Sequence, residues 1–388
     1  MNMPEVSSIY SIPYLIVALI LLWVYKCDQR EYRRCHLQSS SKYAVFAQLL
    51  LLVFIGLRGH LYTDYINYYP FYEELPNILD FRLKHFGDYG WEPGFVIYSS
   101  ILKTIMPNYF GWVFVNTLID IIVLSSFFRK HTQSIPLALF FFIAYWGLQF
   151  EFNLYRNVKA LLLFVLSFKY IERGKFIPYL LINLLGALFH SSAFIYILLY
   201  PIFRCKQNTA IIILLIIVVN ILYFSHFSVS SIVVQIISPL LGGRSVEKIY
   251  EYVANSSEIG FTIGYFERTF ELFLFVALRR QFQAVLPSYQ IFFNLYLCYY
   301  CIYMLFADMS ILTQRLPILL LIGYWVLLVN VFRIQFPYKR IVTCILIIFA
   351  LYRIIMSNNT IVSRYDNLLW GIESYEERRT DFYKHVEI

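Results

Sequence analysis

Long apolar runs separated by short polar segments dominate the chain. The first run, 9–25, is followed but not preceded by basic residues, so we interpret it as a membrane anchor with its N-terminus outside, not as a cleavable signal peptide. The second run, 43–57, leads back to the outer face. With the later runs, this pattern predicts an all-α polytopic membrane protein with about 11–13 transmembrane helices. The later runs are 111–128, 136–150, 157–169, 176–189, 191–203, 210–224, 261–278, 289–306, 316–331 and 341–355.

The segment 94–106 is apolar but too short to span a bilayer, which takes roughly 20 residues. It contains Lys103 and is closed by Pro107. If it lies along the outer interface as a helix that begins at Pro93, the basic clusters between the later runs fall in the cytoplasm, as the positive-inside rule requires. These clusters are Arg129-Lys130, Arg173/Lys175, Arg204/Lys206, Arg279-Arg280 and Arg333/Lys339/Arg340.

The segment 176–203 fits either one tilted helix or two short ones. Two crossings keep both flanking basic clusters inside, so we prefer a break at His190, which places this histidine near the outer face. The resulting organisation is a single membrane domain over 1–388. It has outer loops at 58–110 and 225–260 and a polar C-terminal tail, 357–388, on the outer face.

Composition agrees with a membrane protein. Of the 388 residues, 60% are hydrophobic and only 14% are charged, so the chain has more apolar surface than a soluble domain needs. The net charge of +8 is spread over short gaps, which argues against nucleic-acid binding. The six cysteines show no zinc or disulfide pattern. We interpret Cys298 and Cys301 as small apolar residues one helical turn apart, and expect neither a metal nor a cofactor.

The predicted topology sends a set of polar residues to the outer side, where charges at membrane depth are costly and are commonly functional. Structural alternatives exist for several of them: Arg58 at the end of an apolar helix, Arg156 paired with Glu151, Arg315 paired with Asp308, and His190 in a helical core. The set comprises Arg58, Asp64, Tyr68, Glu92, Glu151, Arg156, His190, Arg244, Tyr250, Asp308 and Arg315.

Several outward arginines around a cavity at membrane level suit a lipid-linked diphosphate. A guanidinium group matches phosphate oxygens with two parallel hydrogen bonds. A nearby carboxylate or histidine can take the proton from a sugar hydroxyl.

Five short motifs, in order along the chain, carry a resemblance to a known family. They are R-x5-D-x2-N-Y-Y at 58–69, W-E-P-G-F at 91–95, Y-R-N-x2-A at 155–160, L-F-H-S-S-A at 188–193 and T-Q-R-L at 313–316. The series resembles the EpsG family of bacterial exopolysaccharide proteins, which is akin to Wzy-type O-antigen and capsule polymerases. In that family the first arginine is often followed by a Val-Gly-x-Asp-Tyr stretch, whereas here Gly59 to Asp64 follow Arg58.

The resemblance implies a GT-C-like membrane glycosyltransferase in the bacterial inner membrane, with its active site facing the periplasm or outside. It would transfer a growing glycan from undecaprenyl diphosphate to the terminal sugar of an incoming lipid-linked repeat unit, without a metal. Partners would be the lipid-linked donor and acceptor, the bilayer, and chain-length regulator and flippase proteins.

The same resemblance suggests roles for individual residues. Asp64 or His190 would be the base, and Glu92 would position the acceptor sugar beside Tyr68. The substrate-binding set would be Tyr68, Tyr250 and four arginines: Arg58, Arg156 and Arg315 on the diphosphate, with Arg244 a weaker fourth.

Other functions fit the same arginines. A flippase or other transporter of lipid-linked oligosaccharides also needs a cationic cavity, but often contains related repeats, and we see none in the sequence. A ligase or single-sugar transferase with a polyprenyl-phosphate donor needs the same anion site and base. A purely structural scaffold would not need so many polar residues on one face.

Overall fold

The computed structural model describes residues 6–35, 41–225, 227–237, 260–308 and 315–385. Over these ranges the chain is helical, with isolated backbone bridges in place of strands, which confirms the predicted all-α class. The chain divides into two compact units. Unit 1 comprises Met1–Leu199, Leu328–Arg333 and Pro337–Ile388, and unit 2 comprises Tyr200–Leu327 and Ile334–Phe336.

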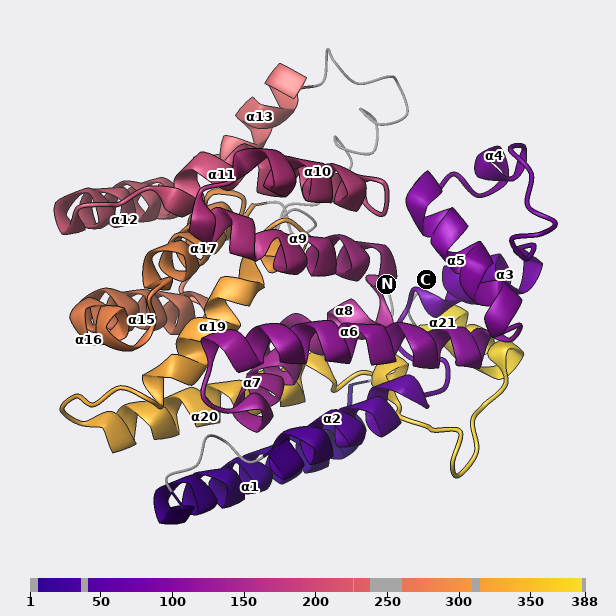
Figure 1. The fold of residues 1–388 in the computed structure, drawn as a ribbon, viewed down its shortest axis with the longest axis horizontal. Coiled ribbons are helices and arrows are strands. Elements are labelled where there is room, and N and C mark those ends of the chain that lie inside the picture. The colour runs from indigo at the N-terminus through magenta and orange to yellow at the C-terminus, as the bar shows by residue number, and fades with distance from the viewer. Residues whose placement is uncertain (1–5, 36–40, 226, 238–259, 309–314, 386–388) are drawn as a thin grey trace. The chain divides into compact units, whose positions relative to one another are not determined.

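Most helices of unit 1 match the predicted apolar runs (Figure 1). The predicted run 136–150 is divided by a π-helical turn, in which Trp146 has a φ of 67°. The elements are η1 (Ser8–Ser11), α1 (Ile12–Cys35), α2 (Ser41–Gly56), α3 (Tyr65–Glu74), α4 (His85–Tyr89), α5 (Pro93–Ile105), α6 (Tyr109–His131), α7 (Ile135–Phe142), η2 (Ile143–Gly147), α8 (Leu148–Phe152), α9 (Tyr155–Arg173), α10 (Phe176–Ala187), η3 (Ser191–Ala193), α20 (Lys339–Ser357), η6 (Ile361–Ser363) and α21 (Tyr375–His385).

Unit 2 is also helical where it is described. Its elements are α12 (Thr209–Phe224), α13 (Val229–Ile237), α15 (Ile263–Ala277), α16 (Arg279–Val285), α17 (Tyr289–Leu305) and η5 (Pro317–Leu320). Two further helices, α11 (Phe194–Arg204) and α19 (Leu321–Val331), contribute residues to both units.

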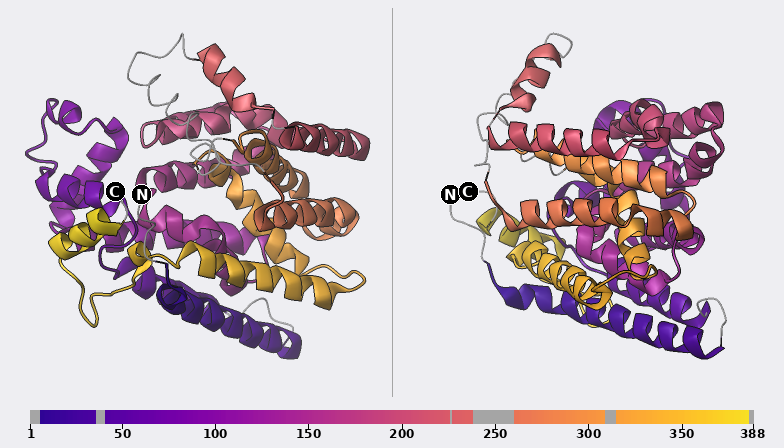
Figure 2. Two further views of the ribbon diagram at one scale, coloured as in Figure 1. Left: turned by 180° about the vertical axis from the view of Figure 1, so that it is seen from behind. Right: turned by 90° about the vertical axis from the view of Figure 1, so that its left-hand side faces the viewer.

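Four helical stretches of the described chain are long and apolar enough to cross a membrane: Ser8–Glu31, Tyr109–His131, Ile135–Phe152 and Lys339–Ser357. Shorter apolar helices accompany them: Lys42–Gly56, Phe176–Ala187, Ser191–Arg204, Thr209–Phe224 and Pro317–Val331. The architecture is that of a helical membrane protein, while the total of about 11–13 crossings stays a prediction. Within unit 1, α1 packs against both α2 and α20 (Figure 2).

Two predictions about irregular places are confirmed. The segment 176–203 forms two helices, α10 and α11, separated at His190 and η3. The segment 94–106 forms the short helix α5, with Pro93 in its first turn. Its Lys103, unexpected in an apolar run, donates a hydrogen bond of 2.7 Å to the carbonyl of Tyr72, so the ammonium group caps the last turn of α3.

The outer loop predicted at 58–110 contains helix α3, whose residues Tyr65, Tyr68 and Tyr72 share one buried face. The rings of Tyr68 and Tyr72 join an aromatic core with Phe95 and Trp112. Figure 1 shows α3, α4 and α5 gathered at one end of α6. This packing fixes the geometry of the polar residues that the loop carries.

The C-terminal tail, predicted only as a polar outer segment, folds back on α3. Tyr375 of α21 stacks on Tyr69, with ring centroids 4.5 Å apart. Its hydroxyl donates a hydrogen bond of 3.2 Å to the carbonyl of Ile66. Pro70, four residues after Ile66, has no N–H to offer this carbonyl, so the tyrosine supplies the donor that the helix lacks.

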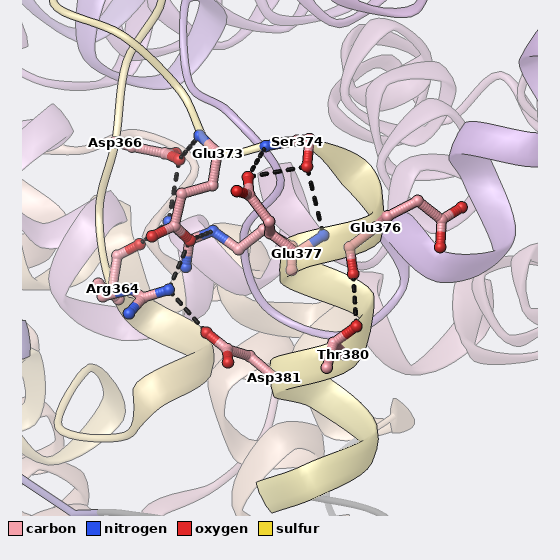
Figure 3. A network of polar contacts seen from close by, with 9 residues as sticks. Arg364, Asp366, Glu373, Ser374, Glu376, Glu377, Thr380 and Asp381 are labelled. Atoms are coloured by element: carbon pink, nitrogen blue, oxygen red, sulfur yellow. Dashed lines mark hydrogen bonds and ion pairs between the residues drawn. The ribbon is translucent and has the colours of Figure 1, made fainter.

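Ion pairs hold the tail in this position (Figure 3). Arg364 pairs with Glu373 and with Asp381 at 2.5 and 2.7 Å. The buried Arg378 pairs with Asp366 at 3.0 Å and with Glu373 at 2.8 Å. The backbone carbonyl of Asp366 in turn accepts a hydrogen bond from Gly59, so the network reaches the first predicted motif.

Candidate functional site

The W-E-P-G motif, Trp91 to Gly94, leads into the first turn of α5. Glu92 is the N-cap and Pro93 follows it in the first turn, where its missing N–H costs nothing. The N–H of Gly94 donates a hydrogen bond of 2.8 Å to the carbonyl of Leu188 at the end of α10. A Cβ atom on Gly94 would lie 2.7 Å from that carbonyl oxygen, so only glycine permits this approach. The motif therefore joins α5 to the segment before His190.

Arg156, in the first turn of α9, is held by this motif. Its Nη1 donates a hydrogen bond of 2.6 Å to Oε2 of Glu92, and its guanidinium carbon lies 5.1 Å from the centre of the Trp91 ring. The Nε atom is buried, with no hydrogen-bond partner in the described part of the chain. The side chain remains 25% exposed. Arg156 is thus a positioned cation whose hydrogen-bonding capacity is only partly used.

Helix α3 brings Tyr68 to Arg156 and begins at Asp64. The buried Tyr68 packs its ring against Trp91, 5.0 Å between centroids, and its hydroxyl interacts with the Arg156 guanidinium. Asp64 is the N-cap of α3, and its carboxylate interacts electrostatically with the Tyr68 hydroxyl. The side-chain oxygen of Asn153 accepts the backbone N–H groups of Thr63 and Asp64, both at 3.1 Å, which fixes the start of α3.

His190 lies at the break between α10 and α11 and contacts the same site. Oε1 of Glu92 accepts a hydrogen bond of 3.3 Å from the backbone N–H of Ser191, the next residue. Asn157, next to Arg156, approaches Nδ1 of His190 to 3.3 Å through its side-chain nitrogen. One carboxylate therefore connects the guanidinium to the histidine segment. We call Tyr68, Trp91, Glu92, Arg156 and His190 the Arg156 cluster.

The Glu92 carboxyl is ionised in this setting. Burial by itself would raise its pKa, but the Arg156 guanidinium and a backbone hydrogen bond outweigh burial, so the pKa of Glu92 lies below its ordinary value. A carboxylate that is already paired is a poor proton acceptor near neutral pH. Glu92 therefore orients Arg156, while its role beside the acceptor sugar stays a prediction.

Arg58 has a different environment from Arg156. It is 2% exposed, and its guanidinium donates hydrogen bonds to the carbonyls of Ile55 and Glu151 and to the Tyr155 hydroxyl. It also lies 4.6 Å from the centre of the Phe152 ring. Tyr155 packs against Tyr68 and so connects Arg58 to the Arg156 cluster.

The alternative pairing of Arg156 with Glu151 is not found, because Arg156 pairs with Glu92. Glu151 is 2% exposed, and its backbone carbonyl binds Arg58. Asp308 accepts hydrogen bonds from Ser228 and Ser230, both at 2.5 Å, instead of pairing with Arg315. Arg315 is an exposed residue of unit 2. Arg244 and Tyr250 lie outside the described residues.

One buried ion pair was not predicted from the sequence. Lys159, one turn beyond Arg156 on α9, pairs with Asp120 of α6, and both side chains are at most 5% exposed. The Lys159 ammonium also lies 5.9 Å from the centre of the Tyr98 ring. A lone aspartate inside the apolar run 111–128 was the available signal, since such a charge needs a partner. The pair fixes the register of α9 and hence the position of Arg156 along it.

Among the described residues, no group of three or more His, Cys, Asp or Glu side chains is placed to hold a metal.

The model of the EpsG family matches residues 42–370, which include all the residues of the Arg156 cluster. No curated protein and no solved structure matches the chain. Since the match covers most of the sequence, the chain belongs to the EpsG family.

Proposed function

We propose that this protein is a polysaccharide polymerase that acts on undecaprenyl-diphosphate-linked repeat units at the outer face of the bacterial inner membrane. Membership of the EpsG family supports a polymerase-type role. The apolar helices support a membrane location. The observation that carries the proposal is the Arg156 cluster, in which a positioned and only partly satisfied arginine stands among Tyr68, Trp91, Glu92 and His190.

In this proposal Arg156 binds the diphosphate of the donor lipid. Its guanidinium keeps N–H groups that Glu92 does not use, and such groups bind phosphate oxygens strongly where water is partly excluded. The half-buried Trp91 ring offers an apolar face beside the cation, of the kind on which a sugar ring packs, and the buried Tyr68 ring packs against Trp91. Glu92 orients Arg156 and positions the acceptor sugar together with Tyr68.

The reaction is a transfer at the anomeric carbon. A hydroxyl oxygen on the terminal sugar of the acceptor attacks this carbon, and the bond from the carbon to the diphosphate oxygen breaks. The hydroxyl proton passes to a base, Asp64 or His190, and undecaprenyl diphosphate leaves with both electrons of the broken bond. Arg156 stabilises the negative charge that develops on the departing oxygen.

The remaining predicted residues have secondary roles in the proposal. Arg58 supports the cluster from behind through Tyr155. Arg315 and Tyr250 are further substrate contacts, and Arg244 is a weaker diphosphate contact, as the family resemblance implies.

The test uses cells that lack this protein and are complemented with the native chain, Arg156→Ala or Arg173→Ala. Arg173 is the matched control because it is an exposed arginine at the other end of the same helix. We expect the native chain and Arg173→Ala to give a ladder of lipid-linked polymer. Arg156→Ala should give single repeat units that accumulate on the outer leaflet.

Other outcomes would contradict the proposal. Accumulation of repeat units on the inner leaflet would point to a flippase. A normal ladder with Arg156→Ala, at native protein levels, would remove Arg156 from the mechanism. A ladder in cells without the protein would exclude the polymerase role.

A further inference from the structure

The imidazole of His190 is hydrogen-bonded to a backbone group that can act only as a donor. His190 caps the short helix η3, and its Nδ1 accepts a hydrogen bond of 3.1 Å from the backbone N–H of Ser192. A peptide N–H can only donate. Nδ1 must therefore present its lone pair, and in the neutral ring the proton resides on Nε2.

Two side chains support the same arrangement. The hydroxyl of Ser192 lies 2.7 Å from Nδ1, and the side-chain nitrogen of Asn157 lies 3.3 Å from both Nδ1 and that hydroxyl. The amide and the hydroxyl both have hydrogens to offer to Nδ1. Asn157 directly follows Arg156 on α9, so the residue that orients the histidine is fixed to the residue that binds the anion.

We infer that His190 acts as a neutral hydrogen-bond donor through Nε2–H, with Asn157 and Ser192 as its positioning residues. This inference rests on the proposed function, and it assigns the donated hydrogen bond to an oxygen of the lipid diphosphate. The Ser191 N–H and Arg156 are anchored to the two oxygens of one carboxylate, Glu92, which keeps the histidine segment and the guanidinium at one anion site. A neutral ring with its proton on Nε2 cannot take a proton there, so the base is Asp64.

Substitutions of His190 differ in where they place an N–H group. The side-chain amide of glutamine can place an N–H near the position of Nε2, whereas that of asparagine lies near Nδ1, and neither amide is a base. We expect His190→Gln to retain at least roughly a tenth of native polymer yield. His190→Asn and His190→Ala should lose on the order of a hundredfold or more. If His190→Gln is as inactive as His190→Ala while both are folded, the donor role is wrong.

A second measurement does not depend on polymer formation. Nitrogen-15 NMR of the full-length protein, labelled at histidine and placed in lipid bilayers, reports which ring nitrogen carries the proton. We expect the His190 signal, identified by its loss in His190→Gln, to show a proton on Nε2. In Asn157→Asp the new carboxylate should draw the proton to Nδ1, and polymer yield should fall about tenfold or more.

The outcomes keep the two proposals apart. A proton on Nδ1 in the native protein overturns the inference. A proton on Nε2 together with a polymer ladder in cells that lack this protein upholds the tautomer but overturns the proposed function. An unchanged His190 signal in Asn157→Asp removes Asn157 as a positioning residue, because a merely structural role would leave the tautomer as it was.

Discussion

Arg58 and Arg156 look alike in the sequence, since each lies at the end of an apolar helix, but their surroundings differ. Arg58 is 2% exposed and donates to two backbone carbonyls and a tyrosine hydroxyl. Arg156 keeps a 25% exposed side chain, one carboxylate partner and a buried Nε without a partner in the described chain. Carbonyl groups that surround a guanidinium leave it no room for a ligand. At Arg156, one carboxylate and one tyrosine hydroxyl orient the guanidinium and leave its Nε–H without a partner in the described chain. This difference in partners is the reason why we propose that Arg156 binds the substrate and that Arg58 is structural.

The largest expected effect is on catalysis at Arg156. Arg156→Ala should lower the rate of polymer formation by about 10²–10³, because a donor to the developing charge is lost. Arg156→Lys should recover only part of this, since an ammonium group cannot replace the planar fork. Polymer formation by purified protein from lipid-linked repeat units measures both. Native activity in Arg156→Lys would show that charge alone suffices.

Arg58 should respond in the opposite way. Arg58→Ala leaves the carbonyls of Ile55 and Glu151 buried without a donor, so we expect the free energy of unfolding to fall by about 3 kcal/mol. Thermal unfolding in detergent, compared with Arg173→Ala, measures this. A variant that folds with native stability but makes no polymer would break the comparison and make Arg58 a direct ligand of the substrate.

Acid should weaken the Arg58 side of the molecule before the Arg156 side. His60 is enclosed by rings that include Tyr69 and Tyr109, and burial lowers its pKa to about 4; Arg378 and Arg58 act in the same direction, and Asp366 opposes them. As the pH falls below neutral, His60 binds a proton in the unfolded chain but not in the folded chain. Stability should fall by about 2 kcal/mol between pH 7 and about pH 5.

The control for this effect is His60→Phe, which keeps a ring in the cage and should abolish its share of the pH dependence. Glu92 should not contribute in this window, because its pKa lies below its ordinary value and it stays ionised. Identical stability curves against pH for the native protein and His60→Phe would contradict the assignment.

Gly94→Ala should have a smaller effect, confined to the Arg156 side. The added Cβ meets the Leu188 carbonyl at 2.7 Å, so α5 must shift from α10 and carry Glu92 with it. We expect polymer formation to fall about tenfold, which corresponds to about 1.4 kcal/mol in the barrier. Gly87→Ala is the matched control, since a Cβ there meets nothing within 4 Å.

The smallest expected effect concerns the tail. Arg364 is 37% exposed and its two acidic partners are similarly exposed, so Arg364→Ala should cost less than about 1 kcal/mol of stability. Polymer formation should stay near native. A large loss of activity in Arg364→Ala would show that the tail holds the outer loop in its active form.

Local patterns in the sequence predicted much of this architecture. The apolar runs correspond to helices, and the break at His190 and the short helix after Pro93 both follow from length and charge. The family motifs also selected Tyr68, Glu92, Arg156 and His190, which the structure brings into one cluster. The helices, the break and the short helix are determined by residues close together in the sequence. Hydrophobic periodicity and the positive-inside rule use the same short-range information.

Features that depend on distant partners were not predictable in the same way. The carbonyl and hydroxyl that bind Arg58 come from residues 93 and 97 positions later, and no pattern near Arg58 announces them. The same holds for Tyr375, whose hydroxyl donates a hydrogen bond to the carbonyl of Ile66, which Pro70 cannot bind. Such pairings arise from tertiary packing, so the sequence identified the arginines but not the role of each.

Binding of undecaprenyl diphosphate to purified protein tests the central claim most directly. The native chain, Arg156→Ala and Arg173→Ala would be compared under one set of detergent and salt conditions. The account predicts that Arg156→Ala binds about tenfold to a hundredfold more weakly, as expected for loss of a charge-assisted hydrogen bond, while Arg173→Ala binds like the native protein. Native affinity in a folded Arg156→Ala variant would contradict it.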